Sequence, residues 1–330
     1  MNIVRARLIY NPTSGREEIR RRLPAILQRL ERGGIETSCH ATEGESDAVL
    51  AASEAVRRGF DLVIAAGGDG TLNEVVSGLS IHDRRPTLGI LPLGTTNDFA
   101  RAHGIPKLWT DACDLIVRGY TRQVDVGKAD DKYFINIAGG GSLTELTYEV
   151  PSKLKTMVGQ LAYYMKGLEK ITRLHPVRMK ITASGTDGKI EINEELMLFL
   201  IANSNSVAGF DRLAPDASTN DGLFDVLALR KCNLGEFIRI ATMVMRGEVV
   251  KNDPHFIYFQ SDRITVESDD RVQLNLDGEF GGTLPCTFSI LPSHLKVIMD
   301  EYGETSYHHG ALAGGTAGGT DGGSARGAQL

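Results

Sequence analysis

The sequence has few cysteines, no long apolar run and no excess of positive charge. Its four cysteines, at positions 39, 113, 232 and 286, are scattered and form no C-x-x-C pair, so we expect reduced thiols in a cytoplasmic protein. No apolar segment approaches the roughly 20 residues that a membrane-spanning helix needs, and we see no signal-peptide pattern at the start of the chain. The net charge of −6 argues against nucleic acid as a partner.

Two of the commonest phosphate-binding fingerprints are also missing. The chain contains neither G-x-x-x-x-G-K-[ST] nor a G-x-G-x-x-G after its first predicted strand. It contains instead a Gly-Gly-Asp-Gly-Thr loop at 67–71, between an apolar run at 61–66 and a segment whose apolar residues recur at helical spacing. Backbone N–H groups and the helix dipole at such a junction favour phosphate. Because a carboxylate alone would repel phosphate, Asp69 indicates a divalent cation beside it.

Residues 1–125 alternate between predicted strands and helices. The expected strands are 5–10, 35–41, 61–66 and 87–92, and the expected helices are 16–32, 47–58, 71–79, 97–103 and 110–118. This alternation predicts a doubly wound, mostly parallel sheet, that is, an α/β domain. Loops that follow parallel strands gather at the carboxyl edge of the sheet, where such folds bind ligands.

Residues 126–300 show a different pattern of short, often alternating segments, which predicts a mainly β domain: an antiparallel β-sandwich, or a barrel. The expected strands are 123–129, 133–138, 176–183, 189–193, 196–203, 223–230, 255–260, 262–268, 271–277 and 284–291. Two helices, near 152–173 and 233–246, interrupt it, and the segment 296–299 is expected to return to the first domain. Residues 303–330 are rich in glycine and alanine, and we expect a disordered tail.

Two further segments carry a family resemblance. Residues 90–101 read Ile-Leu-Pro-Leu-Gly-Thr-Thr-Asn-Asp-Phe-Ala-Arg, and residues 11–15 read Asn-Pro-Thr-Ser-Gly after the first predicted strand. Together with the loop at 67–71, they resemble the bacterial soluble diacylglycerol kinases, within the superfamily that also contains NAD kinases. The resemblance extends over about 3–300. It implies an ATP-dependent lipid kinase that converts diacylglycerol to phosphatidic acid.

The resemblance also implies a nucleotide site. Its expected residues are Asn11, Pro12, Thr13, Ser14, Gly15, Thr42, Gly67, Gly68, Asp69, Gly70, Thr71, Asn73, Gly94, Thr95 and Asn97. Local alternatives stay open for some of them. Asn-Pro-x-Ser-Gly is also ordinary turn chemistry, and Asn97 or Asp98 could cap the helix that follows.

Two acidic sites are expected in the second domain. The resemblance makes Glu279, in Asp-Gly-Glu, the general base that takes the proton of the lipid hydroxyl, with Asp69 as the other catalytic residue. It makes Asp221, with the carbonyls of Ser218 and Leu223, the holder of a structural Mg²⁺, and oxygen ligands of this kind suit a hard cation. The alternatives are an exposed turn at Glu279 and an Asp-Gly hairpin without metal at Asp221.

We expect the lipid substrate to be presented at a membrane surface, with transient peripheral contact. Basic residues near the start of the first helix (Arg16, Arg20, Arg21, Arg22) and around 152–173 (Lys153, Lys155, Lys166, Lys170, Arg173) are candidates for that contact, although such charges are often only solvated. Homodimerisation stays open. The alternative functions are a kinase for another lipid alcohol (phosphatidylglycerol, a sphingoid base or a polyprenol), an NAD-kinase-like enzyme, and a nucleotide-binding regulator without turnover.

Overall fold

The computed structural model describes most of the chain, and all structural statements below concern these residues: 3–14, 18–141, 175–185, 188–204, 218–246, 248 and 252–300. Several expectations lie outside the described residues. They are the helix at 152–173 with its lysines, Gly15, Arg16 and the tail at 303–330.

The first half is built on a parallel sheet. Its strands are paired in the order β2–β1–β3–β4, with bounds β1 Val4–Tyr10, β2 Ile35–Ala41, β3 Leu62–Gly67 and β4 Thr87–Pro92. All six residues of β3 are buried, as expected for a central strand covered on both faces. Five helices accompany the sheet: α1 Glu18–Arg32, α2 Asp47–Arg57, α3 Asp69–Ser80, α4 Asp98–Ala102 and α5 Trp109–Arg118.

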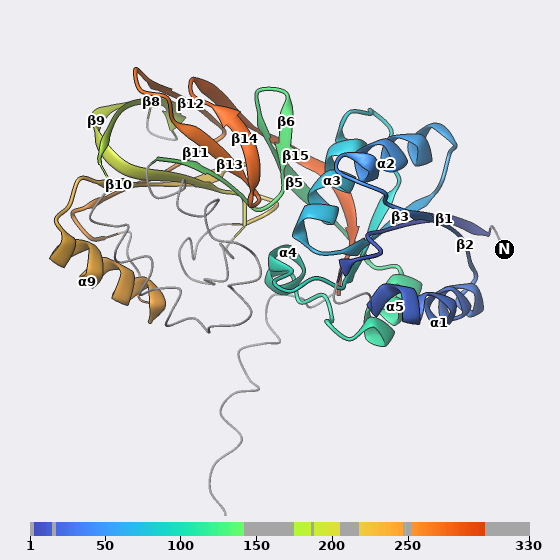
Figure 1. The fold of residues 1–330 in the computed structure, drawn as a ribbon. Coiled ribbons are helices and arrows are strands. Elements are labelled where there is room, and N and C mark those ends of the chain that lie inside the picture. The colour runs from blue at the N-terminus through green and yellow to red at the C-terminus, as the bar shows by residue number, and fades with distance from the viewer. Residues whose placement is uncertain are drawn as a thin grey trace, which may run out of the picture.

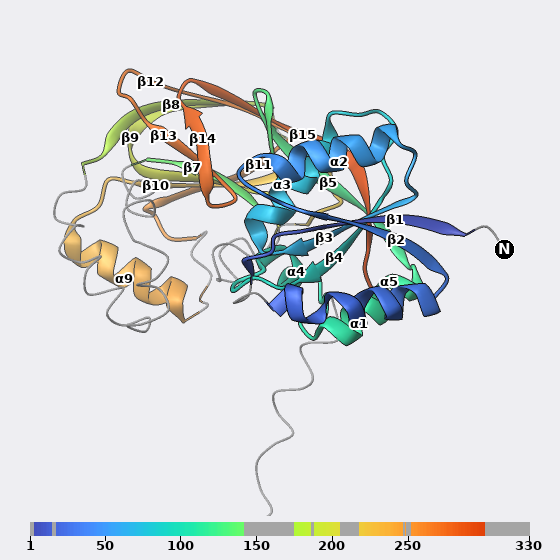
Figure 2. The same cartoon turned by 45° about the vertical axis from the view of Figure 1, so that its right-hand side comes forward.

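The longer helices cover the two faces of this sheet. Helices α2 and α3 lie together on one face, and α1 and α5 lie together on the other (Figures 1 and 2). This arrangement confirms the predicted doubly wound α/β architecture. Because the strands are parallel, the carboxyl ends of β1, β2, β3 and β4 lie at one edge of the sheet.

The second half is dominated by antiparallel pairing. One described helix accompanies it, α9 Leu234–Met245, which a capping box of Asn233 and Glu236 starts. The strands are β5 Thr121–Ala129, β6 Lys132–Phe134, β7 Ile137–Gly140, β8 Val177–Gly185, β9 Gly188–Ala202, β10 Phe224–Arg230, β11 Phe256–Ser261, β12 Arg263–Ser268, β13 Gln273–Leu276, β14 Glu279–Thr283 and β15 Cys286–Ile298.

The structure corrects several predicted element bounds. Helix α3 begins at Asp69, two residues earlier than expected, so Gly70 lies in its first turn. The strand expected at 133–138 is two strands, β6 and β7, separated at Ile135 and Asn136, because the N–H groups there bind an aspartate instead of a neighbouring strand. Strand β14 was not expected, because its sequence, Glu-Phe-Gly-Gly-Thr, lacks apolar alternation.

Strand β15 joins the two halves (Figure 1). It pairs with β12 at one end and lies parallel to β4 at the other, where Val297 is opposite Leu88. It therefore contains both the strand expected at 284–291 and the one expected at 296–299. A register shift against β5 between Leu291 and Leu295 marks the passage from one half to the other.

The hydrophobic core is divided in two. One cluster surrounds the parallel sheet and includes Val126 and the end of β15. The other begins at Ala129 and contains aromatic contacts of Phe288 with Phe134 and Phe199, at 6.5 and 6.0 Å between ring centroids. The first cluster thus continues past the domain boundary predicted at 125/126, through Val126, and that boundary stays a prediction.

Candidate active site

The predicted nucleotide residues that the structure describes lie at the carboxyl edge of the parallel sheet, in the loops after β1, β2 and β4 and where β3 passes into α3. In the first loop Asn11 Oδ1 accepts hydrogen bonds from the N–H and the hydroxyl of Thr13, at 2.9 and 2.8 Å, which is an Asx turn. The N–H of Asn11 donates to the carbonyl of Ala66 at the end of β3 (3.2 Å), and that of Thr42 donates to Tyr10 (2.9 Å). These bonds bring the loops after β1, β2 and β3 side by side.

The loops after β3 and β4 are in direct backbone contact. The N–H groups of Leu93 and Gly94 donate to the carbonyl of Gly67, at 2.9 and 3.0 Å. A Cβ on Gly94 would lie 2.4 Å from the Cα of Gly68, so the approach requires glycine. Asn97, in the left-handed region with a φ of 51°, holds Gly94 through both of its amide atoms.

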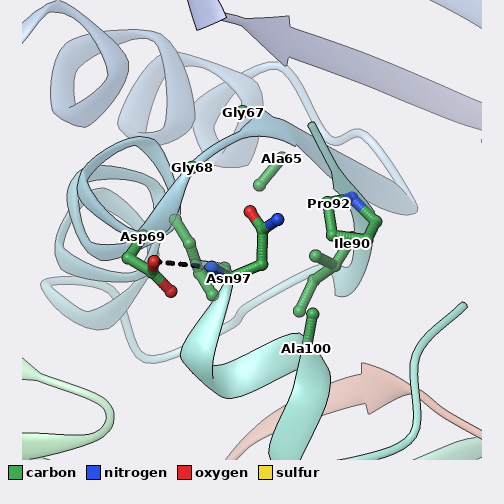
Figure 3. A pocket seen from close by; sticks show the side chains of 9 residues that line it. Ala65, Gly67, Gly68, Asp69, Ile90, Pro92, Asn97 and Ala100 are labelled. Carbon is green, nitrogen blue, oxygen red and sulfur yellow. Dashed lines mark hydrogen bonds between the residues drawn. The ribbon is translucent and has the colours of Figure 1, made fainter. Parts of the chain in front are cut away.

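Asp69 ties the two loops together (Figure 3). Its Oδ2 accepts the N–H of Asn97 at 2.9 Å and its Oδ1 accepts that of Asp98 at 2.6 Å. Burial raises the pKa of Asp69, and these two N–H groups oppose the increase. Asn97 stands at the N-cap position of α4, but its side chain makes no capping bond. The carboxylate of Asp69, at the start of α3, accepts the N–H groups of Asn97 and Asp98 there instead.

A narrow pocket lies between these loops (Figure 3). It is lined by Ala65, Gly67, Gly68, Asp69, Leu72, Ile90, Pro92, Asn97 and Ala100. Of the other expected nucleotide residues, Thr71 is buried and Thr95 is exposed. The hydroxyl of Thr71 lies close to Gly67: a Cβ added to Gly67 would be 2.5 Å from the Thr71 Oγ1.

The Asp-Gly-Glu segment meets this region from the second half of the chain. A Cβ on Gly70 would lie 3.5 Å from Oε1 of Glu279, so the carboxylate of the predicted base adjoins the phosphate loop. Partial burial raises the pKa of Glu279, and the negative charges of Glu45 and Glu74 raise it further.

Asp277 fixes the turn that carries Glu279. Its carboxylate accepts the N–H groups of Ile135, Asn136 and Ile137, at 2.7, 2.9 and 2.9 Å. It also accepts the side-chain N–H of Asn73 of α3 at 2.8 Å. Asn73 therefore binds the second half of the chain through its amide nitrogen, and its contact with a nucleotide stays a prediction.

Two acidic residues with structural contacts in this region were not singled out from the sequence. One is Asp277, in the predicted strand 271–277, and the other is Glu74, directly after Asn73. The carboxylate of Glu74 accepts the N–H groups of Ser46 and Ala48, at 3.0 and 3.1 Å, at the start of α2. The sequence signal that could have pointed to Asp277 is its Asp-Gly dipeptide, which is typical of a turn. In the structure this turn is left-handed, with φ values of 51° and 98° at 277 and 278.

The predicted metal residues lie in one loop, which is hydrogen-bonded to Asp125. Asp221 Oδ1 accepts the N–H of Leu223 at 3.0 Å, and Ser218 donates its hydroxyl to Asn220 at 2.6 Å. Asp125 is 1 % exposed; it accepts the N–H of Gly222 at 2.8 Å and donates its own N–H to Thr219 at 2.6 Å. Burial, with a smaller contribution from the charge of Asp125, raises the pKa of Asp221.

The described residues show neither a side-chain metal cluster nor a membrane-crossing helix. No three His, Cys, Asp or Glu side chains gather there as metal ligands, so the predicted magnesium site rests on one carboxylate and two backbone carbonyls. None of the described helices is both long and apolar enough to span a bilayer.

Comparison with known proteins identifies the family. Residues 5–129 match the family model of the diacylglycerol kinase catalytic domain. The chain is 56 % identical over 296 residues to a diacylglycerol kinase from Bacillus subtilis, covering 89 % of this chain and 96 % of that protein. The chain belongs to the diacylglycerol kinase family. This membership confirms the resemblance found in the sequence.

Other members agree in sequence and in fold. A diacylglycerol kinase from Staphylococcus aureus is 47 % identical over 293 residues, or 89 % of this chain and 91 % of that one. A crystal structure from Bacillus anthracis, 26 % identical, has a TM-score of 0.79 and covers 92 % of this chain and 97 % of its own. Residues 146–299 match the model of the YegS C-terminal NAD kinase beta sandwich-like domain, in agreement with the predicted β-sandwich.

Proposed function

We propose that this protein is an ATP-dependent lipid kinase that phosphorylates the hydroxyl of diacylglycerol and yields phosphatidic acid. The observation that supports the proposal best is the position of Glu279, whose carboxylate adjoins Gly70 of the phosphate loop from the other half of the chain. A hydroxyl bound between them has a base on one side and the terminal phosphate of ATP on the other.

In the proposed mechanism the four loops at the edge of the parallel sheet bind the triphosphate through backbone N–H groups. Glu279 accepts the proton of the lipid hydroxyl. The hydroxyl oxygen forms a bond to the γ-phosphorus while the bond from that phosphorus to the β,γ-bridging oxygen breaks, and ADP leaves. Asp277 holds the turn of Glu279 against α3 through Asn73, so the base and the phosphate loop keep a fixed separation.

Magnesium is implied by the family, and two places in the chain fit it. The carboxylate of Asp69 has about four acceptor sites, more than the backbone N–H groups that it accepts, so a lone pair remains for a cation beside the triphosphate. The charge of Asp221 is partly desolvated near that of Asp125, and a cation held by Asp221 with the carbonyls of Ser218 and Leu223 would offset their repulsion. Bound magnesium neutralises charge on the phosphate oxygens.

We also propose that the enzyme acts in the cytoplasm and contacts the membrane surface only transiently, where the lipid is presented. Turnover of diacylglycerol presented in vesicles tests this proposal. Turnover should increase when diacylglycerol is moved from neutral to anionic vesicles, and equal turnover on both would contradict electrostatic contact.

Labelled ATP and a total lipid extract test the function itself. We expect label in phosphatidic acid, and far less label, by about 10²–10⁴-fold in rate, with Glu279→Gln. Label confined to another lipid would favour the lipid-alcohol alternatives. Label in NADP when NAD is added would favour an NAD-kinase-like enzyme, and ATP binding without any transfer would favour a regulator.

The pH dependence should report the charges around Glu279. A general base must be ionised, so the acid limb of kcat/KM should lie above the ordinary glutamate pKa of about 4.3. Because Glu45 raises the pKa of Glu279, Glu45→Gln should move that limb to lower pH. Glu36→Gln, an exposed glutamate on β2, is the control. An unchanged limb in Glu45→Gln would mean that the limb belongs to another group.

Asp221→Ala should remove the stabilisation of the protein by magnesium. A cation that binds only the folded chain stabilises it by mass action, by about 2.7 kcal/mol at one hundred times its Kd. The melting temperature of the wild type should therefore rise during a magnesium titration, and that of the variant should stay flat. Asp131→Ala, which changes an exposed aspartate, is the control. If the melting temperatures of Asp221→Ala and the wild type changed identically with magnesium, the segment at Asp221 would be a hairpin turn that holds no metal.

A further inference from the structure

The irregular segment between β6 and β7 is held from both sides. Its N–H groups, at Ile135, Asn136 and Ile137, donate to Asp277. Its carbonyls face Asn203 at the end of β9. The side chain of Asn203 donates to the carbonyl of Ile135 at 2.8 Å, and its backbone N–H donates to that of Asn136, also at 2.8 Å. The position of Asp277 therefore depends on a segment that Asn203 fixes.

The same amide group of Asn203 also reaches the metal loop. Its Nδ2 donates a second bond, of 3.0 Å, to the carbonyl of Asp125. Asp125 in turn holds the loop through Thr219 and Gly222. A continuous chain of hydrogen bonds thus leads from the loop of Asp221, through Asp125 and Asn203, to the turn of Glu279.

The burial of Asn203 argues that these donated bonds matter. The residue is 0 % exposed, and its Oδ1 has no hydrogen-bond partner among the described residues. Leaving a buried carbonyl oxygen unpaired costs about 1–3 kcal/mol. A residue that only filled the space would avoid this penalty. Asparagine is the side chain that places two N–H donors between the carbonyl of Asp125 on β5 and that of Ile135 at this short reach.

We infer that Asn203 is a positioning residue that couples the Asp221 loop to Glu279. The inference rests on the proposed function, in which Asp221 holds magnesium and Glu279 is the base. When the loop at 218–223 is ordered around its cation, Asp125 is fixed. Asn203 then fixes the segment at 135–137, on which Asp277 aims Glu279 at the lipid hydroxyl. The path itself contains none of the predicted nucleotide residues, and Asn73 contacts only its end, at Asp277.

Hydrogen exchange with magnesium alone tests the coupling without ATP or lipid. In the wild type we expect magnesium to slow exchange both in the loop at 218–223 and at the N–H groups of 135–137, the latter by about tenfold, within the usual range of coupling between sites. In Asn203→Ala the slowing should persist at 218–223 and disappear at 135–137. Slowing at both places in the variant, or at 218–223 alone in the wild type, would overturn the inference.

The matched control is Ser261→Ala. Ser261 is 1 % exposed, and its hydroxyl lies within 2.7 and 2.8 Å of two backbone carbonyls in the same half of the chain, but off the path. The Ser261→Ala variant should be less stable than the wild type, and magnesium should still slow exchange at 135–137 in it. If Asn203→Ala does not fold, Asn203→Ser is used, which keeps one hydroxyl donor and should show a weakened response.

Kinetics supply a second readout. Asn203→Ala should lower kcat by about 10²-fold, the effect of a misplacement of roughly 1 Å, with the ATP Kd unchanged, whereas Ser261→Ala should leave both unchanged. A loss of ATP affinity instead would place Asn203 in the nucleotide site and overturn the inference. Intact coupling in the exchange experiment together with no lipid phosphorylation would instead overturn the proposed function.

Discussion

Glu279→Gln should lower kcat by about 10²–10⁴-fold, the usual contribution of general acid–base catalysis, and leave ATP binding unchanged. Glutamine keeps the shape and hydrogen-bonding reach of glutamate but cannot accept the proton of the lipid hydroxyl. The nucleotide loops are formed by residues before position 100, and their mutual bonds do not involve Glu279. The measurements are turnover of detergent-dispersed diacylglycerol and direct titration with ATP.

Glu267→Gln is the control for this experiment. It changes an exposed glutamate that pairs with Lys180 on the far strands β8 and β12, so kcat should stay unchanged. If Glu279→Gln instead weakened ATP binding while turnover at saturation persisted, Glu279 would belong to the nucleotide site. The proposed mechanism would then lack a base.

Asp69→Ala should abolish lipid phosphorylation while the fold remains intact. The substitution removes two charge-assisted hydrogen bonds to the N–H groups of Asn97 and Asp98, each worth about 1.5–3 kcal/mol. It also removes an oxygen ligand for magnesium. The loops after β3 and β4 then lose their register around the triphosphate, but the apolar core of the parallel sheet is unaffected. Turnover, ATP binding and thermal melting measure the three consequences.

Asp61→Ala is a matched control, because Asp61 also accepts a backbone N–H, that of Arg5, at 2.9 Å. It directly precedes β3, at the opposite end of the strand from Asp69, so it should affect stability and not turnover. Near-normal turnover of Asp69→Ala, with ordinary magnesium dependence, would remove Asp69 from the catalytic site. Loss of folding in Asp69→Ala would show that the bonds of Asp69 to the start of α4 are required for the fold, and would contradict the prediction.

Local patterns in the sequence were sufficient for the parallel half of the fold. The strand ends at Tyr10, Ala41, Gly67 and Pro92 were expected within about one residue, because apolar runs and glycine turns are local signals. Parallel strands place their carboxyl ends at one edge. The gathering of the loops that follow these strands could therefore be predicted without a structure.

The break at Ile135 and Asn136 could not be predicted in this way. Both residues continue an alternating pattern that is typical of one strand, and only the carboxylate of Asp277 draws their N–H groups away from a neighbouring strand. The same is true of α4, where the expected local cap is replaced by Asp69. A short-range pattern does not contain a partner that lies far away in the chain.

The sequence by itself determined the family, the α/β and antiparallel halves and the phosphate loops, because each depends on residues close together in the chain. Only the tertiary structure decided that Glu279 adjoins Gly70, that Asp125 holds the loop of Asp221 and that Asn203 joins that loop to the turn of Asp277. These contacts depend on how β15 returns to β4 and on buried polar groups that must find partners across the two halves.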